Sequence, residues 1–352
     1  MNNRSIYQQA LLWLIMGGVA LTTVVMSCKK TKTAVQSYAQ VNLVSDTSTF
    51  GAARVDAALD NPWGIAIGPT GGIWIAVNHS GLSVIYDGNG ASLRSPVTMG
   101  DLSSTGAVYN STSAFIIPGT GAPAKFIYAS EDGIITAWNA GDTFVNVADR
   151  SGADAVYKGL DIASDGGAMY LYAADFHNAK IDVFDPSFNL VSKPFSDPSI
   201  PLGFAPFNIK NIGGMLYVTY AKQKGPDNED DQSGAGNGYV DIYKPDGSLV
   251  SRFATQGTLN SPWAVVQAPD GFGLGNGVIL IGNFGDGRIN VFDSKGEYKG
   301  QLQNDGTVIT IEGLWALVFP QAGMGSLDPN TLYFTAAPGE EEFGIFGYLK
   351  KK

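Results

Sequence analysis

The sequence predicts an all-β fold: a six-bladed β-propeller closed by an N-terminal strand that completes the last blade. Two long, related segments indicate it first, NPWGIAIGPTGGIWIAVNHSGLSVIYDGNG at 61–90 and SPWAVVQAPDGFGLGNGVILIGNFGDGRINVFDSKGE at 261–297. More degenerate copies bring the repeats to six, and they begin about 50 residues apart, near the length of a four-stranded blade. Outside the N-terminus, no segment of the sequence has sustained helical periodicity.

Each repeat begins with an apolar run that we predict to be the innermost strand of a blade. A second β-rich run follows, then an alternating third run that ends in a turn such as DGNG or KPDGS, then a more polar fourth. Gly, Pro and Asp are frequent between the runs, as tight hairpins require. The six predicted innermost strands are residues 63–67, 114–117, 159–162, 207–209, 263–266 and 314–319.

The sixth repeat has only three such runs, at 314–319, 331–336 and 344–349. A spare β-rich segment, 38–44, precedes the first repeat. We expect it to complete the last blade, because ring closure hides two strand edges that would otherwise favour aggregation. The predicted propeller domain is 38–349, followed by a tail at 350–352. A long β-sandwich or a solenoid is the alternative.

The N-terminal sequence predicts where in the cell the protein resides. Residues 1–27 have the layout of a secretory signal, with Arg4, then an apolar stretch and small residues. The ending VMSC at 25–28 resembles the lipobox of bacterial lipoproteins, which implies cleavage before Cys28 and acylation of that residue. Residues 28–37 then form a tether, and the protein is expected in the cell envelope, lipid-anchored on the periplasmic side of a membrane such as the outer membrane. An uncleaved transmembrane anchor is the alternative.

Composition limits the chemistry. Cys28 is the sole cysteine, so the predicted domain has no disulfide, cysteine nucleophile or zinc-finger site. The formal net charge is −10 and no basic patch is visible, which argues against nucleic-acid binding. An acidic domain favours cations, cationic groups or neutral polymers as partners, with solubility as the simpler explanation. We expect a monomer.

The repeats resemble NHL-type six-bladed propellers, and more closely a family of secreted bacterial propellers with no assigned activity. Some members of that family carry a C-terminal PEP-CTERM sorting tail. The resemblance runs from about residue 41 to residue 349 and implies the fold without a particular chemistry. It rests on LVSD (43–46), NPWGIA (61–66), YDGNG (86–90), GNGYVDIY (236–243), SPWAVV (261–266), IGNFGDGRINVFD (281–293) and EGLWAL (312–317). The chain departs from the pattern at both ends, with a lipobox in front and LKKK behind.

One face of the predicted propeller gathers most of the candidate site residues. Strand direction alternates within a blade, so loops from second to third strands share a face with the residues that enter each first strand. Oxygen ligands from several blades suit calcium or magnesium, and their type and placement resemble the channel ligands of gluconolactonase-like propellers. The alternative is that they cap turns. The candidate ligand or metal residues are Asn78, Glu131, Asp175, Asn283 and Glu312.

Catalytic candidates are weaker. His177 and Glu131 could act in acid–base chemistry near the channel, but each could equally have a structural role in its turn. The recurring Trp63, Trp263 and Trp315 are expected to pack between blades. The acidic insert 225–238 is expected to be a solvated loop at the rim.

The first hypothesis is therefore a non-enzymatic, lipid-anchored module that binds a ligand, a protein or an extracellular polymer through an acidic loop face. The alternative is a calcium- or magnesium-dependent hydrolase or lactonase with its site at the channel mouth. A purely structural envelope protein is a third hypothesis. No other cofactor is expected.

Overall fold

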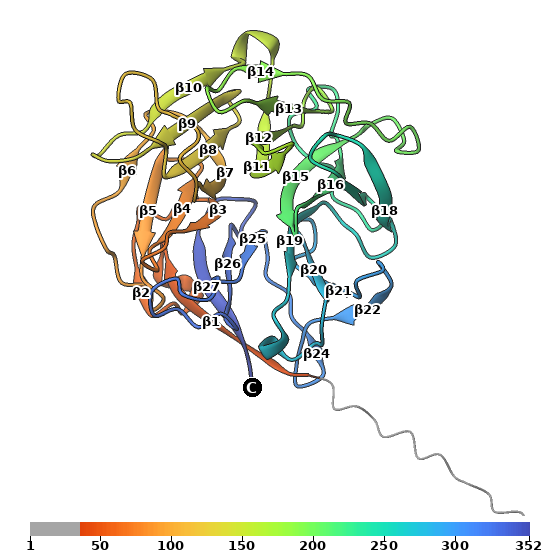
Figure 1. The fold of residues 1–352 in the computed structure, drawn as a ribbon. Coiled ribbons are helices and arrows are strands. Elements are labelled where there is room, and N and C mark those ends of the chain that lie inside the picture. The colour runs from red at the N-terminus through yellow and green to blue at the C-terminus, as the bar shows by residue number, and fades with distance from the viewer. Residues whose placement is uncertain (1–35) are drawn as a thin grey trace, which may run out of the picture. The chain divides into compact units, whose positions relative to one another are not determined.

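Six β-sheets form a ring around a central channel in the computed structural model, which describes residues 36–352 (Figure 1). Structural neighbours reported below share this all-β, six-bladed propeller fold. The predicted signal peptide, Cys28 and residues 28–35 of the tether lie outside the described residues. No helix of the described part is long and apolar enough to cross a membrane.

Five blades are four-stranded antiparallel sheets, each built from consecutive strands. Blade 1 consists of β3 (Pro62–Ile67), β4 (Ile73–Val77), β5 (Leu82–Tyr86) and β6 (Val97–Thr98), and blade 2 of β7 (Ser104–Tyr109), β8 (Phe126–Ser130), β9 (Ile134–Trp138) and β10 (Val145–Asp149). Blade 3 consists of β11 (Tyr157–Asp165), β12 (Ala168–Asp175), β13 (Lys180–Phe184) and β14 (Leu190–Val191). Blade 4 consists of β15 (Phe204–Ile212), β16 (Met215–Lys222), β17 (Gly238–Tyr243) and β18 (Leu249–Thr255), and blade 5 of β19 (Pro262–Gln267), β20 (Ile279–Asn283), β21 (Ile289–Phe292) and β22 (Tyr298–Gln301).

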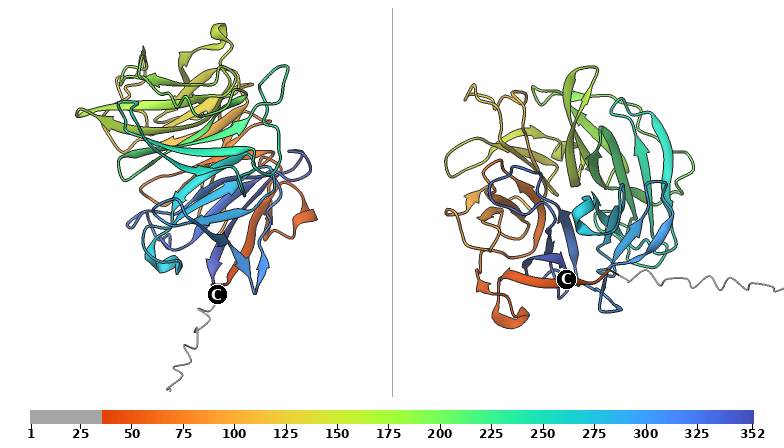
Figure 2. Two further views of the ribbon diagram at one scale, coloured as in Figure 1. Left: turned by 90° about the vertical axis from the view of Figure 1, so that its right-hand side faces the viewer. Right: turned by 60° about the horizontal axis from the view of Figure 1, so that its bottom comes forward.

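Blade 6 contains strands from both ends of the described chain. Its sheet order is β2-β1-β27-β26-β25, with β25 (Leu314–Val318), β26 (Leu332–Ala336), β27 (Ile345–Lys351), β1 (Tyr38–Ser45) and β2 (Arg54–Val55). Strand β1 pairs antiparallel with β27, from Tyr38 opposite Lys351 to Ser45 opposite Ile345. Figure 2 shows the red N-terminal strand beside the dark blue C-terminal strand in both views.

Short elements complete the described fold. The hairpin of β23 (Gln303–Asn304) and β24 (Thr307–Val308) follows blade 5. The helical elements of residues 36–352 are single 3-10 turns: η1 (Ser48–Phe50), η2 (Ser151–Ala153) and η3 (Asp270–Phe272).

The innermost strand of blade 2 differs from the prediction. It is β7, whereas residues 114–117 lie in the loop that joins β7 to β8. Two physical reasons explain the difference. The loop carries Pro118 and Pro123, and proline cannot donate a ladder hydrogen bond. Strand β7 also carries Gly106, where a Cβ atom would lie 2.6 Å from the Leu160 side chain, so a small residue is needed between neighbouring inner strands.

The inner strands β3, β7, β11, β15, β19 and β25 surround the centre of the ring (Figure 1). Each contacts the next, and β25 contacts β3, so the inner wall is continuous. We call the face where these strands begin the amino face and the face where they end the carboxyl face. The strands approach closely: a Cβ atom at Gly159 would lie only 1.8 Å from Oδ1 of Asn208.

Aromatic side chains fill the channel near the amino face. The indole of Trp315 stacks on Trp63 with ring centroids 3.5 Å apart and on Phe284 at 4.0 Å. Trp263 meets Trp315 edge to face at 5.6 Å. The three tryptophans are at most 4% exposed, so they pack between blades as expected. Further along the channel, a cavity of about 30 Å³ is lined by small inner-strand residues such as Gly64 and Gly106.

Candidate functional site

A buried lysine lies at the centre of the amino face. Lys158 is the second residue of β11, and its side chain is only 2% exposed. Its Nζ atom forms an ion pair with Oε1 of Glu131, which follows β8 in the neighbouring blade. The ammonium also lies above two aromatic rings, 5.2 Å from the centroid of Trp63 and 5.9 Å from that of Phe176. An ammonium can be buried here because it has both a counter-ion and aromatic faces.

Three further carboxylates lie close enough to act on this ammonium. Oδ1 of Asp230 is 3.9 Å from Nζ. The charge of Glu341 acts on Lys158, and the charge of Lys158 acts on the carboxyl group of Asp231. We call Lys158, Glu131, Asp230, Asp231 and Glu341 the Lys158 cluster. Burial alone would lower the pKa of the Lys158 ammonium, but Glu131, Asp230 and Glu341 together outweigh burial, so the pKa lies above its ordinary value. The cluster therefore has one fixed positive charge and four carboxyl groups.

Glu131 is held in place from a second side. Its Oε2 accepts a hydrogen bond of 2.9 Å from Nδ2 of Asn78, which follows β4 in blade 1. Asn61 lies 3.4 Å from Asn78 and accepts the indole N–H of Trp63 at 2.9 Å. Asn61 has φ 51°, in the left-handed region where asparagine is tolerated better than most residues. A polar chain thus runs from blade 1 through Glu131 to Lys158 in blade 3.

Glu341 is a strongly perturbed member of the cluster. It and its neighbour Glu340 both have left-handed backbone, with φ of 70° and 56°. Its Oε1 atom is buried and has no hydrogen-bond partner among the described residues. Burial, reinforced by the charge of Glu131, raises the pKa of Glu341 to about 7. Strained backbone, an unpartnered buried oxygen and a carboxyl that titrates near neutrality are features that concentrate at functional sites.

The acidic insert contributes Asp230 and Asp231. Its backbone is tied to β16, because the Gln232 N–H donates to the Lys222 carbonyl at 2.7 Å. Burial raises the pKa of Asp231, although Lys158 opposes that effect. Asp230 is 71% exposed, so the Lys158 cluster is open to solvent on this side. The insert, expected to be a solvated loop, is thus hydrogen-bonded to blade 4 and contributes carboxyl groups to the cluster.

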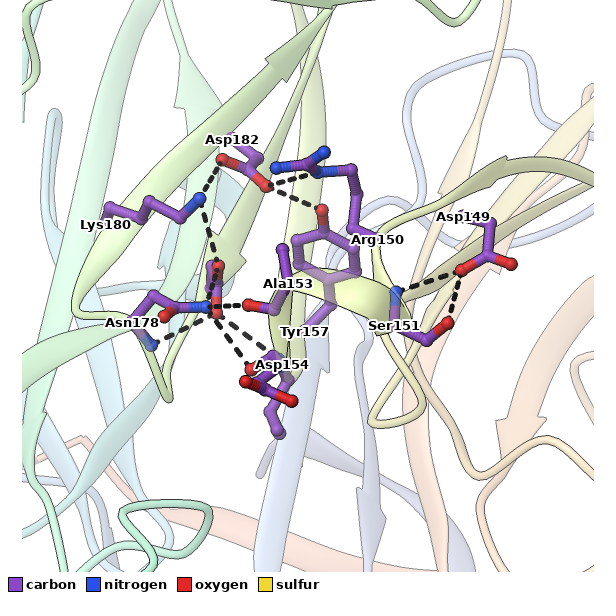
Figure 3. Close-up of polar contacts among 11 residues, drawn as sticks. Asp149, Arg150, Ser151, Ala153, Asp154, Tyr157, Asn178, Lys180 and Asp182 are labelled. Carbon is purple, nitrogen blue, oxygen red and sulfur yellow. Dashed lines mark hydrogen bonds and ion pairs between the residues drawn. The ribbon is translucent and has the colours of Figure 1, made fainter.

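Asp175 belongs to a separate polar network between blades 2 and 3. Its carboxylate is fully buried, accepts hydrogen bonds from Asn178 and lies 3.5 Å from Nζ of Lys180. Figure 3 shows Lys180 and Arg150 on either side of Asp182, which also accepts the Tyr157 hydroxyl at 2.8 Å. Burial raises the pKa of Asp175.

The remaining predicted residues make their hydrogen bonds to nearby loops and not to Glu131. Asn283 donates to the Thr258 carbonyl at 2.8 Å and to Asp286 at 3.0 Å. Glu312 accepts the Gly339 N–H at 2.9 Å, and His177 contacts the Asp227 carbonyl at 2.9 Å. Among residues 36–352, no hydrogen bond or ion pair joins Asp175, Asn283 or Glu312 to Glu131. The structure therefore brings Asn78 and Glu131 together, and a shared role for the other three stays a prediction.

The metal hypothesis meets a physical obstacle at Glu131. Within the described part of the chain, no group of three or more His, Cys, Asp or Glu side chains is arranged to hold a metal ion. The Lys158 ammonium already lies against Glu131 and near Asp230. A divalent cation bound by Glu131 would have to displace or repel that buried ammonium.

Lys158 and Glu341 were not predicted as site residues from the sequence. One signal for Lys158 is its position in YKGL, where a charged residue lies at the start of an inner strand. The run Glu340–Glu341–Glu342 marks the loop, but nothing in it distinguishes Glu341 from its neighbours. Their proximity to Glu131 depends on ring closure, which brings blades 2, 3 and 6 to one channel mouth.

Comparison with known proteins shows which family the chain belongs to. No family model matches the chain. It is 36% identical over 332 residues to the uncharacterized protein R648 of Acanthamoeba polyphaga mimivirus, covering 89% of this chain and 80% of that one. It is also 36% identical over 335 residues to the uncharacterized protein L690 of the same virus, covering 89% and 86%. The chain belongs to the family of these two proteins, and the resemblance to secreted bacterial propellers stays a prediction.

Solved structures show the class of fold. The streptogramin B lyase structure superposes with a TM-score of 0.54 at 12% identity, covering 90% of this chain and 97% of that one. The virginiamycin B lyase of Staphylococcus aureus gives the same TM-score at 10% identity, covering 89% and 98%. At this identity the likeness concerns the propeller fold and carries no residue roles.

Proposed function

We propose that this protein is a lipid-anchored binding module of the cell envelope, on the periplasmic side of a membrane, whose amino face binds a cationic group of a ligand or partner. The observation that carries the proposal is the Lys158 cluster, in which four carboxyl groups surround one ammonium and Oε1 of Glu341 has no partner. Lys158 neutralises one carboxylate, so the cluster keeps an excess of negative charge when the others are ionised. The anchor is proposed from Cys28 and its lipobox-like surroundings.

The geometry favours a ligand cation that approaches from solvent. Asp230 is mostly exposed and Glu131 is 26% exposed, whereas Lys158 is buried beneath them. A second ammonium would therefore meet carboxylates first and the like charge of Lys158 only from a distance.

A titration calorimetry experiment with spermidine as the probe tests this proposal. We expect Glu341→Gln to weaken spermidine binding by about 5- to 10-fold at pH 8, as loss of one charge-assisted contact would. Glu340→Gln removes the same charge from the adjacent, exposed position and should change affinity by less than about twofold. Equal effects of both variants, or no heat of binding at low salt, would contradict the proposal.

An enzyme at the same site is the second candidate, and the Glu341 carboxyl favours it. A pKa of about 7 suits a general base at neutral pH. Solved structures that share the fold include lyases, which is an analogy of fold alone. The version with calcium or magnesium at Asn78, Glu131, Asp175, Asn283 and Glu312 is tested by metal analysis of the purified protein. Stoichiometric metal that is lost on Glu131→Ala and on Asn283→Ala would favour it over the binding module.

A further inference from the structure

A large cavity lies at the opposite end of the channel from the Lys158 cluster. Its volume is about 870 Å³, within the range of small-molecule sites. The carboxyl ends of the inner strands line it, including Ile67, Tyr109 and Gln267 at the ends of β3, β7 and β19. The turns that follow these strands close its sides. The predicted sites on the amino face do not use this cavity.

The cavity contains an ion pair. Asp161 and Lys210 lie on neighbouring inner strands with 3.2 Å between Oδ2 and Nζ. Asp161 also accepts the backbone N–H groups of Asn211 and Ile162, each at 2.8 Å, and its side chain is 8% exposed. Lys210 is 35% exposed and has N–H donors left for a ligand. The pair is neutral overall, so it orients a polar ligand without selecting an anion or a cation.

The rest of the lining is mainly neutral. The side chains of Ser111, Gln267, Asn276 and Gln321 make no hydrogen bonds within residues 36–352 and are exposed. Amide and hydroxyl groups of this kind both donate and accept hydrogen bonds. Beyond Asp161 and Lys210, the one charged residue in the lining is the exposed Asp270.

Apolar surface lies next to these polar groups. Tyr109 and Phe319 are both half-buried in the lining. Aromatic rings beside neutral hydrogen-bonding groups match a ligand that has hydroxyl groups at its edges and C–H groups on its faces. A purely apolar ligand would leave the polar groups unpaired, which costs free energy. An anionic ligand would find Lys210 already neutralised by Asp161.

From this lining we infer that the cavity at the carboxyl face binds a neutral carbohydrate of one to three sugar units. The inference is independent of the proposed cation site, because no residue of the Lys158 cluster lines the cavity. It assigns the two ends of the channel to ligands of different chemistry.

Binding to an array of neutral mono-, di- and trisaccharides, followed by calorimetry on the strongest ligand, tests the inference. We expect millimolar or tighter binding, loss of at least tenfold in affinity in Gln267→Trp, which adds a bulky side chain to the lining, and a smaller loss in Gln267→Ala. Gln40→Trp is the matched control, because Gln40 is exposed on the outer strand β1 and does not line the cavity. Glu341→Gln should bind the sugar like the parent.

Three outcomes would overturn the inference. One is the failure of every neutral sugar to bind. Another is a preference for the uronic acid form of a sugar over its neutral form. The third is a bound sugar whose affinity falls in Glu341→Gln and stays unchanged in Gln267→Trp. The Gln267 and Gln40 variants should keep the thermal midpoint of the parent, so that lost binding is not lost folding.

Discussion

Lys158 of blade 3 and Glu131 of blade 2 form an ion pair that bridges two blades at the amino end of the channel. The lysine is 2% exposed and the glutamate 26%, so one partner is buried and the other is half open to solvent. Asn78 of blade 1 holds the second oxygen of Glu131. The pair therefore links two blades and is part of the proposed site.

Removal of the Lys158 charge should lower the stability of the fold. We expect Lys158→Met to lower the free energy of unfolding by about 3 kcal/mol, because Glu131 and its acidic neighbours lose their buried counter-ion. The double variant Lys158→Met/Glu131→Gln should recover part of that loss. Chemical denaturation measures both values. Lys299→Met, which breaks surface ion pairs with Asp293 and Glu297, is the control and should cost much less stability than Lys158→Met. A Lys158 variant as stable as this control would show that the pair is not a structural link.

Glu341 should make stability depend on pH. Its pKa in the folded protein is about 7, above its ordinary value of 4.5, so the folded state binds more protons than the unfolded state between these values. Its contribution to stability is present at low pH and is lost as pH rises toward 7. We expect Glu341→Gln to be about 1–2 kcal/mol more stable than the parent at pH 8 and similar to it near pH 4.5.

Glu340→Gln is the control for this pH dependence, and the difference between the two variants is the quantity to compare. Other buried acids act in the same direction: burial raises the pKa of Asp241 to about 6. Their effect is common to both variants and cancels. A difference between the variants that stays constant from pH 4.5 to pH 8 would be evidence against the raised pKa.

Strand β1 should be essential to the ring. Deletion of residues 29–46 removes the partner of β27 and exposes its edge, so we expect aggregation or a thermal midpoint lowered by at least about 10 °C. Deletion of residues 29–35 alone is the matched control, since it leaves β1 intact, and should melt like the parent. Equal melting of both deletions would contradict closure of the last blade by β1.

Cys28 should determine where the protein resides. We expect Cys28→Ala, made with residues 1–27 intact, to move the protein from the membrane fraction to the soluble fraction of a bacterial host. Cys28→Ser tests the same thiol with a closer substitute and should behave likewise. Retention of both variants in the membrane fraction would point to an uncleaved anchor.

The repeat predicts much of the fold because each blade is a local module with its own turns. The failure at residues 114–117 shows the limit of this reasoning: an apolar run in a loop resembles an inner strand until the packing of Gly106 on Leu160 is known. The site was predicted only in part for a related reason. Glu131 and Asn78 stand at equivalent turns and were found, whereas Glu341 acquires its properties from burial beside residues of other blades.

The position of a bound organic cation in a crystal structure decides whether the Lys158 cluster is a cation site. We propose a crystal structure of residues 36–352 grown with spermidine at pH 8. The account predicts an amine nitrogen within hydrogen-bond distance of Oε1 of Glu341, with Asp230 or Glu131 as a second contact and Lys158 still paired with Glu131. Spermidine bound elsewhere on the propeller while these carboxylates contact only water would contradict it.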